Sequence, residues 1–513
     1  MRKIFKLRKN ALLMKKRGFD TRKYLEAQTA KIKERLSKFD NKLYLEFGGK
    51  ILYDGHASRV LPGYQADAKI QLISKLKDLE VIYCISAKDI QKGRVRYDSG
   101  LTYDLQTLNE INEIKEKGLK IMGIVITRYE RENLALKFKR KLQHLGHTVY
   151  VHTEIKGYPN NIKKILSKGG FAKQPFIKTY SPLIIVTGAG GGSGKMAVCL
   201  SQLFHEQKKG VNAGYAKFET FPIWNLPLNH PVNTAYEAAT ADLGDYNMID
   251  PFHLKKYKTK SVNYNRDVEN FVILKRIMKA VTKKDNYVNN YFSPTDMGVN
   301  MAKVGILDDK IVRKSAKEEI IRRYFRYKQE YTLGIETKRT IDYMGQIMAK
   351  SKVSEANYPL VKEARKGALK ARARKEGHKG AYCGAAVELR DGTIVRAHNS
   401  RWFHAESAVI IKALKKLSKV HKSKRLLHQD MITQMQLLKQ KLGEEGASLN
   451  VEETMVLIGI SALTDRNAKM VLDHVDKLRG LNMHLTHIPK NGDEAGIKKL
   501  RLNVTTDSEM KLQ

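Results

Sequence analysis

Short apolar runs alternate with amphipathic stretches of helical length along the first half of the chain. Runs rich in β-branched and aromatic residues, which predict strands, lie at 42–47, 81–86, 121–127, 148–153, 183–186 and 211–218. Stretches with helical periodicity lie at 21–38, 69–77, 107–117 and 132–145. Strands that alternate with helices of this length are typical of an open, mostly parallel sheet, so we predict an α/β fold.

The pattern changes twice along the rest of the chain. It becomes helical after about residue 265, and near residue 381 two strand-like runs begin that are joined by Asp391-Gly392, a strong hairpin signal. We therefore predict a basic N-terminal arm, an α/β domain, a helical region and a C-terminal α/β domain. Their predicted bounds are 1–17, 18–265, 266–380 and 381–513.

The richest stretch for chemistry runs from the apolar strand at 183–186 into a glycine loop. Five of the seven residues from 188 to 194 are glycine, and Lys195 then opens a helix. Glycines allow backbone N–H groups to converge on an anion, the helix N-terminus adds partial positive charge, and a lysine can reach outer phosphates. The predicted cofactor-binding residues are Gly188, Gly190, Gly191, Gly192, Ser193, Gly194 and Lys195.

The loop is close to the P-loop pattern but departs from it at two positions. Ala189 stands at the first glycine position, and Met196 stands where a Ser or Thr would bind magnesium. A magnesium ion would need another donor, such as Ser193 or Thr187. A dinucleotide-binding fingerprint fits less well, because Ser193 also occupies its third glycine position. A tight packing turn between a strand and a helix is the alternative.

Polar residues follow the later strands of the predicted sheet. Lys217 and Glu219 end the run at 211–218, and Asp250 follows a short apolar run at 247–249. Because ligands of open α/β sheets bind beyond the carboxyl ends of the strands, we predict Lys217, Glu219 and Asp250 as catalytic residues. Weaker candidates at the site edges follow the earlier strands: Lys88, Arg128 and His152.

Charge and cysteine content narrow the class of protein. The 513 residues carry 95 Lys and Arg against 53 Asp and Glu, a net charge of +42, which attracts nucleic acid and other anionic surfaces. The stretch at 361–380 is strongly basic, so nucleic acid is the alternative partner. Three scattered cysteines without a CxxC pair argue against a disulfide framework. No apolar run approaches the about 20 residues of a membrane span, so we expect a cytoplasmic protein without a membrane. The basic arm leaves an organelle-targeting helix as a lesser alternative.

The C-terminal domain begins like a cytidine deaminase. After the hairpin comes HAESAVIIKALKKL, in which the resemblance implies that His404 would bind zinc and Glu406 would carry protons. The resemblance also requires a downstream Pro-Cys-x-x-Cys, yet no cysteine follows Cys383. We therefore expect deaminase-like topology, with neither a zinc site nor deaminase activity.

Long motifs across the chain resemble one bacterial family, domain of unknown function 1846. The motifs that carry this resemblance include GFDTRKYLEAQ, GSGKMAVCLSQL, GYAKFETFPIWNLPLNHPVN, VNYNRDVE and SPTDMGVNMA. The resemblance runs from about Gly18 to near the C-terminus and implies an α/β part, a helical insert and a deaminase-like C-terminal part. It implies no mechanism. Some members carry a zinc-protease label, but this sequence has no HExxH.

The resulting hypothesis is a protein that binds a nucleotide or a phosphorylated metabolite at residues 188–195. ATP with magnesium is the cofactor we would test first, and transfer, ligation and hydrolysis all stay open. The alternative is a non-catalytic protein that binds nucleic acid through its basic surfaces. We also expect a homo-oligomer.

Overall fold

The structure is a computed structural model that describes residues 17–39, 42–95, 100–377, 380–444 and 446–508. The chain divides into two compact units, Met1–Lys317 and Glu318–Gln513, and helix α14 (Asp309–Thr332) crosses the division. The predicted basic arm lies outside the described residues apart from Arg17. The division into an arm, an α/β domain, a helical region and a C-terminal domain, with boundaries after residues 17, 265 and 380, stays a prediction.

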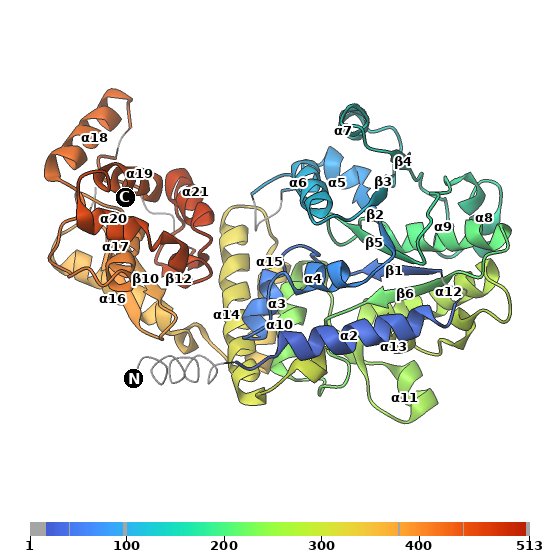
Figure 1. Ribbon diagram of the computed structural model, residues 1–513. Helices are drawn as coiled ribbons and strands as arrows, with labels where there is room; N and C mark the ends of the chain where they lie inside the picture. The colour runs from blue at the N-terminus through green and yellow to red at the C-terminus, as the bar shows by residue number, and fades with distance from the viewer. Residues whose placement is uncertain (1–16, 40–41, 96–99, 378–379, 445, 509–513) are drawn as a thin grey trace, which may run out of the picture. The chain divides into compact units, whose positions relative to one another are not determined.

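The first unit is built on a seven-stranded sheet in which every pair of neighbouring strands is parallel (Figure 1). Its strand order is β4-β3-β2-β5-β1-β6-β9. The strands are β1 (Leu43–Phe47), β2 (Leu79–Ser86), β3 (Ile121–Thr127), β4 (Val149–Val151), β5 (Leu183–Gly188), β6 (Gly214–Phe218) and β9 (Gly298–Val299). The predicted α/β class with a large parallel sheet is confirmed.

Helices connect these strands. Those of the first unit are α2 (Thr21–Leu36), α3 (Gly55–Val60), α4 (Ala68–Lys75), α5 (Ala87–Gln91), α6 (Tyr103–Glu116), α7 (Asn133–His144), α8 (Ile162–Leu166), α9 (Lys195–Lys208), α10 (Pro231–Ala239), α11 (Pro251–Tyr257), α12 (Asn265–Val281) and α13 (Pro294–Met297). Two tyrosines mark the two faces of the sheet. Tyr44 of β1 donates a hydrogen bond to Glu206 of α9, whereas Tyr83 of β2 donates one to Glu110 of α6. Because their register partners on β5 are three residues apart, these side chains point to opposite faces, and α9 and α6 cover different faces.

The structure differs from the predicted pattern at the later strands. Strand β6 pairs with β1, which in turn pairs with β5, so one strand separates β6 from the strand that leads into the glycine loop. The short run at 247–249 is a strand, β7 (Asn247–Ile249), but it pairs antiparallel with β8 (Val262–Tyr264) in a separate two-stranded sheet. A three-residue run carries no information on which sheet it joins, which is why the sequence pattern could not separate it.

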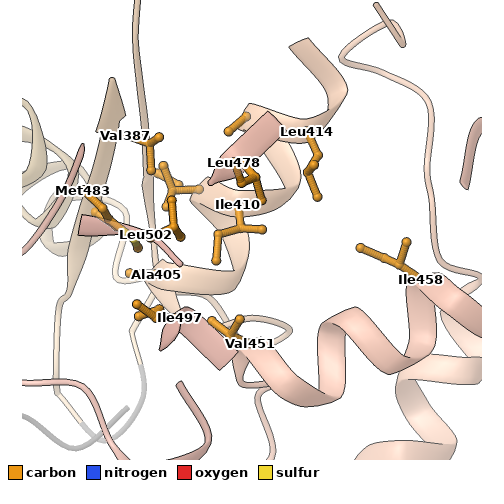
Figure 2. Packing of buried hydrophobic residues seen from close by; sticks show 14 of the residues in the cluster. Val387, Ala405, Ile410, Leu414, Val451, Ile458, Leu478, Met483, Ile497 and Leu502 are labelled. Atoms are coloured by element: carbon orange, nitrogen blue, oxygen red, sulfur yellow. The ribbon is translucent and has the colours of Figure 1, made fainter. Parts of the chain in front are cut away.

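The second unit contains a four-stranded mixed sheet of order β11-β10-β12-β13. The predicted hairpin is present: β10 (Gly384–Glu388) and β11 (Ile394–His398) are antiparallel, while β12 (Asn482–Leu485) and β13 (Asn503–Thr506) are parallel. Its helices are α15 (Lys338–Lys350), α16 (Pro359–Ala373), α17 (Ala405–Leu417), α18 (Gln429–Lys441), α19 (Val451–Ser461), α20 (Arg466–Leu472) and α21 (Asn491–Lys499). Figure 2 shows its apolar core, where Ile410 and Leu414 of α17 pack near Leu478 and residues of the sheet such as Val387.

Among the described residues, none of the helices combines the length and the apolar character that crossing a bilayer requires.

Candidate functional site

The glycine loop lies at a point where the connections of the sheet change direction. Strand β2 leads to β3 on one side, whereas its neighbour β5 leads through α9 to β6 on the other side. Neighbouring strands whose connections part in this way leave a crevice at their carboxyl ends, which is the usual ligand position in open α/β sheets. The predicted loop at 188–194 follows β5 directly and therefore lies at this position.

Glycine is required at three positions of the loop for different structural reasons. Gly192 and Gly194 adopt left-handed backbone angles, with φ of +75° and +82°. At Gly188 a Cβ would lie 2.2 Å from the carbonyl oxygen of Cys84 in β2, so only glycine allows this close approach. Thr127, at the end of β3, donates a hydrogen bond to the carbonyl oxygen of Ser193 and fixes the loop against the sheet.

Lys195 is turned into the loop that precedes it. Its ammonium donates hydrogen bonds to the carbonyl oxygen of Gly190, at 3.0 Å, and to the hydroxyl of Ser193, at 3.3 Å. The residue is only 8% exposed, and within the described part of the chain it forms no ion pair with a carboxylate. The N-terminus of α9 also has no side-chain cap, because Gly194 occupies the capping position. The loop therefore combines a buried cation with uncapped backbone N–H groups.

The strand register brings further polar groups to the same face as α9. Glu46 of β1 is the register partner of Lys217 of β6, and its carboxylate accepts a hydrogen bond of 2.7 Å from Tyr215. Cys84 of β2 lies on this face in register with Gly188. Burial raises the pKa of the Cys84 thiol to about 12, with the cation of Lys195 opposing and the carboxylate of Glu46 adding to the effect. Glu46 was not predicted, although a lone Glu within the apolar run LYLEF was the available signal.

Lys217 and Glu219 form a compact charge cluster with Asp267 at the start of α12. The ammonium of Lys217 lies 2.7 Å from a carboxylate oxygen of Glu219 and 2.7 Å from one of Asp267. Burial alone would lower the pKa of Lys217, but the carboxylates of Asp267 and Glu219 raise it above its usual value. Burial raises the pKa of Glu219, which also accepts a hydrogen bond from the indole of Trp224. The structure thus joins two of the predicted catalytic residues, while Asp267 was missed.

Asp250 has a structural environment of a different kind. One carboxylate oxygen accepts hydrogen bonds from the backbone N–H groups of Phe252 and His253 and so caps α11. The other accepts hydrogen bonds from the side chains of Asn263 and Thr295. All four donors lie outside the glycine loop, so the structure does not bring Asp250 into contact with the predicted cofactor-binding residues.

Two of the three weaker candidates share a local partner. Lys88 and Arg128 both pair with one carboxylate oxygen of Glu154, at 2.6 Å and 2.9 Å. His152 is buried, and burial followed by the nearby His205 lowers its pKa to about 3, so the imidazole is neutral at pH 7. Lys88, Arg128 and Glu154 thus link the segments that follow β2, β3 and β4.

A surface cavity of about 500 Å³ lies beside α8 and α12. Its lining residues are Gly157, Tyr158, Asn160, Asn161, Ile162, Lys163 and Arg276. Burial raises the pKa of Tyr158, and the carboxylate of Glu46 adds to this effect.

The second unit contains two fully buried pairs of an acid and a histidine. His404 contacts Asp493 at 2.6 Å, and His487 contacts Glu406 at 2.8 Å. Burial alone would lower the pKa of His487, but the carboxylate of Glu406 raises it to about 10. Within the described residues, no group of three His, Cys, Asp or Glu side chains is placed to hold a metal ion. The two residues at the deaminase-like positions thus pair with other side chains of their own unit.

Comparisons with known proteins agree with the motifs in the sequence. The family described as "Domain of unknown function DUF1846, N-terminal" matches residues 17–352, and its C-terminal counterpart matches residues 357–513. A UPF0371 protein of Clostridium tetani is 43% identical over 494 residues, which cover 96% of this chain and 97% of that protein. A UPF0371 protein of Clostridium botulinum (strain Alaska E43 / Type E3) is 43% identical over 493 residues, with the same coverage. The resemblance drawn from the motifs is confirmed.

Proposed function

Because this chain belongs to the family of domain of unknown function 1846, whose name states no activity, we propose its function from the glycine loop. We propose that residues 188–195 bind the phosphate groups of a nucleotide or of a phosphorylated metabolite. In this proposal Lys195 contacts the outer phosphate oxygens, and the backbone N–H groups at the start of α9 contact the remaining ones.

The uncompensated charge of Lys195 is the observation that carries the proposal. Buried charges in proteins are normally paired, because removing an ion from water without a partner costs several kcal/mol. Here the ammonium has only a carbonyl oxygen and a hydroxyl as partners among the described residues. A phosphate dianion in the loop would supply the missing counter-charge. A packing turn, the alternative, needs the glycines but gives no reason for a buried lysine.

The neighbouring charged groups support a reactive site, and we propose Lys217 and Glu219 as its catalytic residues. A buried carboxyl with a raised pKa, such as that of Glu219, is suited to carry a proton near neutral pH. Lys217 would stabilise negative charge that develops on the ligand. For Asp250 we propose only an indirect role, through helix α11, which it caps. Transfer, ligation and hydrolysis are all compatible with these groups.

Calorimetric titration of ATP and of inorganic phosphate, with and without Mg²⁺, tests the proposal. We expect wild-type protein to bind ATP with a Kd near or below about 100 µM, which is about 5.5 kcal/mol, and Lys195→Ala to abolish binding. Lys208→Ala, at the exposed opposite end of α9, is the matched control and should bind like wild type. Equal binding by the wild type and both variants, or binding by none of them, would refute a phosphate site at the loop. Light scattering on the same samples tests the predicted homo-oligomer.

A further inference from the structure

The second unit gathers positive charge along one edge of its sheet. Strand β11 is the edge strand, and α16 and α17 pack on opposite faces of the hairpin that it forms with β10. Cations from these three elements converge there. We call this group the basic edge, and its members are Lys370 of α16, Arg374 at the C-terminal cap of α16, Arg396 of β11, and Lys412 and Lys415 of α17.

Close contacts define the position of the basic edge. The ammonium of Lys412 donates a hydrogen bond of 3.3 Å to the backbone carbonyl of Arg396, which links α17 to the edge strand. On the other face, Arg396 pairs with Glu363 of α16 at 2.7 Å. The ammonium of Lys415 donates to the backbone carbonyls of Lys422 and Lys424, so the following basic loop lies alongside.

Acidic side chains do not balance this charge. Residues 362–376 contain seven Lys and Arg against two Glu, and residues 405–425 contain seven against one Glu, which is buried. Within the described residues, Lys370, Arg374 and Lys412 form no ion pair. Partial burial, and after it the charges of Lys370, Arg396, Lys415 and Arg374, lower the pKa of Lys412. The fold therefore keeps like charges close together at a cost in stability.

Protection of the edge strand does not explain the whole arrangement. A charged side chain on an edge strand prevents pairing with other strands, and Arg396 alone meets that need. The cations of α16 and α17 lie on or next to helices, and of these, among the described residues, only Lys412 contacts the backbone of β11, through the carbonyl of Arg396. Their convergence calls for an external anion of matching extent.

We propose that the basic edge binds the phosphate backbone of nucleic acid. Arg374 caps the C-terminus of α16 one helical turn after Lys370, about 6 Å further along the helix axis, so the cations form an extended row rather than a single point. A phosphate backbone presents single negative charges in a row, and neutralising them releases condensed counterions. Because the basic edge contains no aromatic side chain for stacking on bases, the binding is independent of sequence.

The test compares two triple variants of the full-length protein by fluorescence anisotropy with a labelled duplex DNA and a labelled single-stranded RNA. The first variant is Lys370→Gln/Arg374→Gln/Lys412→Gln, which leaves the paired Arg396 in place. The matched control removes the same charge from exposed residues of α7 in the first unit. Its substitutions are Lys137→Gln, Arg140→Gln and Lys141→Gln.

The basic-edge variant should bind at least tenfold more weakly than wild type, and the slope of log K against log salt should fall by about 3. The control should stay within about twofold of wild type, apart from the shared change in net charge. An equal loss in both variants would overturn the proposal, since binding would then follow net charge alone. Retained nucleic-acid binding by the basic-edge variant, or no binding by wild type, would also overturn it. So would a basic-edge-dependent affinity for anionic lipid vesicles without affinity for nucleic acid. Thermal unfolding checks that each variant is folded.

Discussion

Replacing Lys195 with methionine separates the effect of the buried charge on the stability of the free protein from its effect on phosphate binding. Methionine has a similar length and volume but carries no charge, so Lys195→Met keeps the packing of the first turn of α9. In the free protein the variant loses two hydrogen bonds of a charged donor, each worth about 1.5–3 kcal/mol. The variant also lacks the desolvation penalty of an unpaired ammonium, which is several kcal/mol, and this stabilises its folded state. We therefore expect the free energy of unfolding to change by no more than about 2 kcal/mol, in either direction.

Ligand binding, in contrast to stability, should change strongly in Lys195→Met. Loss of two charge-assisted contacts to phosphate, at the lower limit of about 1.5 kcal/mol each, removes about 3 kcal/mol, which is about 150-fold in Kd. At a ligand concentration of about 100 times the wild-type Kd, wild-type protein gains about 2.7 kcal/mol of stability, and the variant should gain only about 0.3 kcal/mol. Thermal unfolding of both proteins, with and without ATP and Mg²⁺, measures both quantities in one experiment.

Two results would refute this reasoning. If Lys195→Met destabilises the free protein by more than about 3 kcal/mol, the ammonium is a structural cap of the loop and its charge is compensated within the chain. If the variant keeps the ligand-induced gain in stability, the phosphate binds elsewhere. Lys208→Met is the control for loss of a lysine from the same helix, and it should match wild type in both measurements.

Three further predictions concern other parts of the structure. Gly188→Ala should destabilise the protein by about 2 kcal/mol or more in urea unfolding, because the added Cβ would meet a carbonyl oxygen of β2. At Gly191 an added Cβ would meet open space, so Gly191→Ala should leave stability unchanged and weaken only ATP binding. Lys217→Met leaves two buried carboxylates together, so it should lower the free energy of unfolding by about 3 kcal/mol at pH 7. This loss should shrink toward pH 5 as the carboxyls take up protons, and a loss that is constant with pH would contradict the charge explanation. The folded-state pKa of His487 is raised to about 10 from about 6.5, so its stabilising effect is complete below pH 6.5 and declines by up to about 1.4 kcal/mol per pH unit toward pH 10. Urea unfolding of Glu406→Gln at several pH values should no longer show this slope.

The sheet could be predicted because its strands are local patterns. Each of the buried strands β1, β2, β3 and β5 is a short apolar run that neighbouring helical stretches isolate, so composition alone marks it. The strand order could not be predicted, because the insertion of β5 between β1 and β2 depends on contacts between segments more than 100 residues apart. For the same reason the position of β1 between β5 and β6 could not be predicted.

The site shows the same limit at the level of single residues. The glycine loop has a local signal, since a strand, five glycines and a lysine lie within 13 residues of the sequence. The partners of Lys217 have none, because Asp267 lies 50 residues further along the chain. That none of the described acids pairs with Lys195 is likewise a property of the fold, because the sequence contains many acids and does not show which of them reach the loop.

The two proposals rest on the same physical feature, positive charge without a counter-charge in the described part of the chain, and salt distinguishes them. The charge of Lys195 is single and buried, where ions of the solvent screen it weakly, so ATP affinity should fall less than about tenfold between about 50 and 200 mM salt. The basic edge is exposed, and neutralisation of five phosphates implies a slope near −4.5, which is a loss of about 500-fold over the same range. If nucleic-acid binding and ATP binding weaken in parallel with salt, both ligands use the exposed charge, and the glycine loop loses its assignment as the nucleotide site.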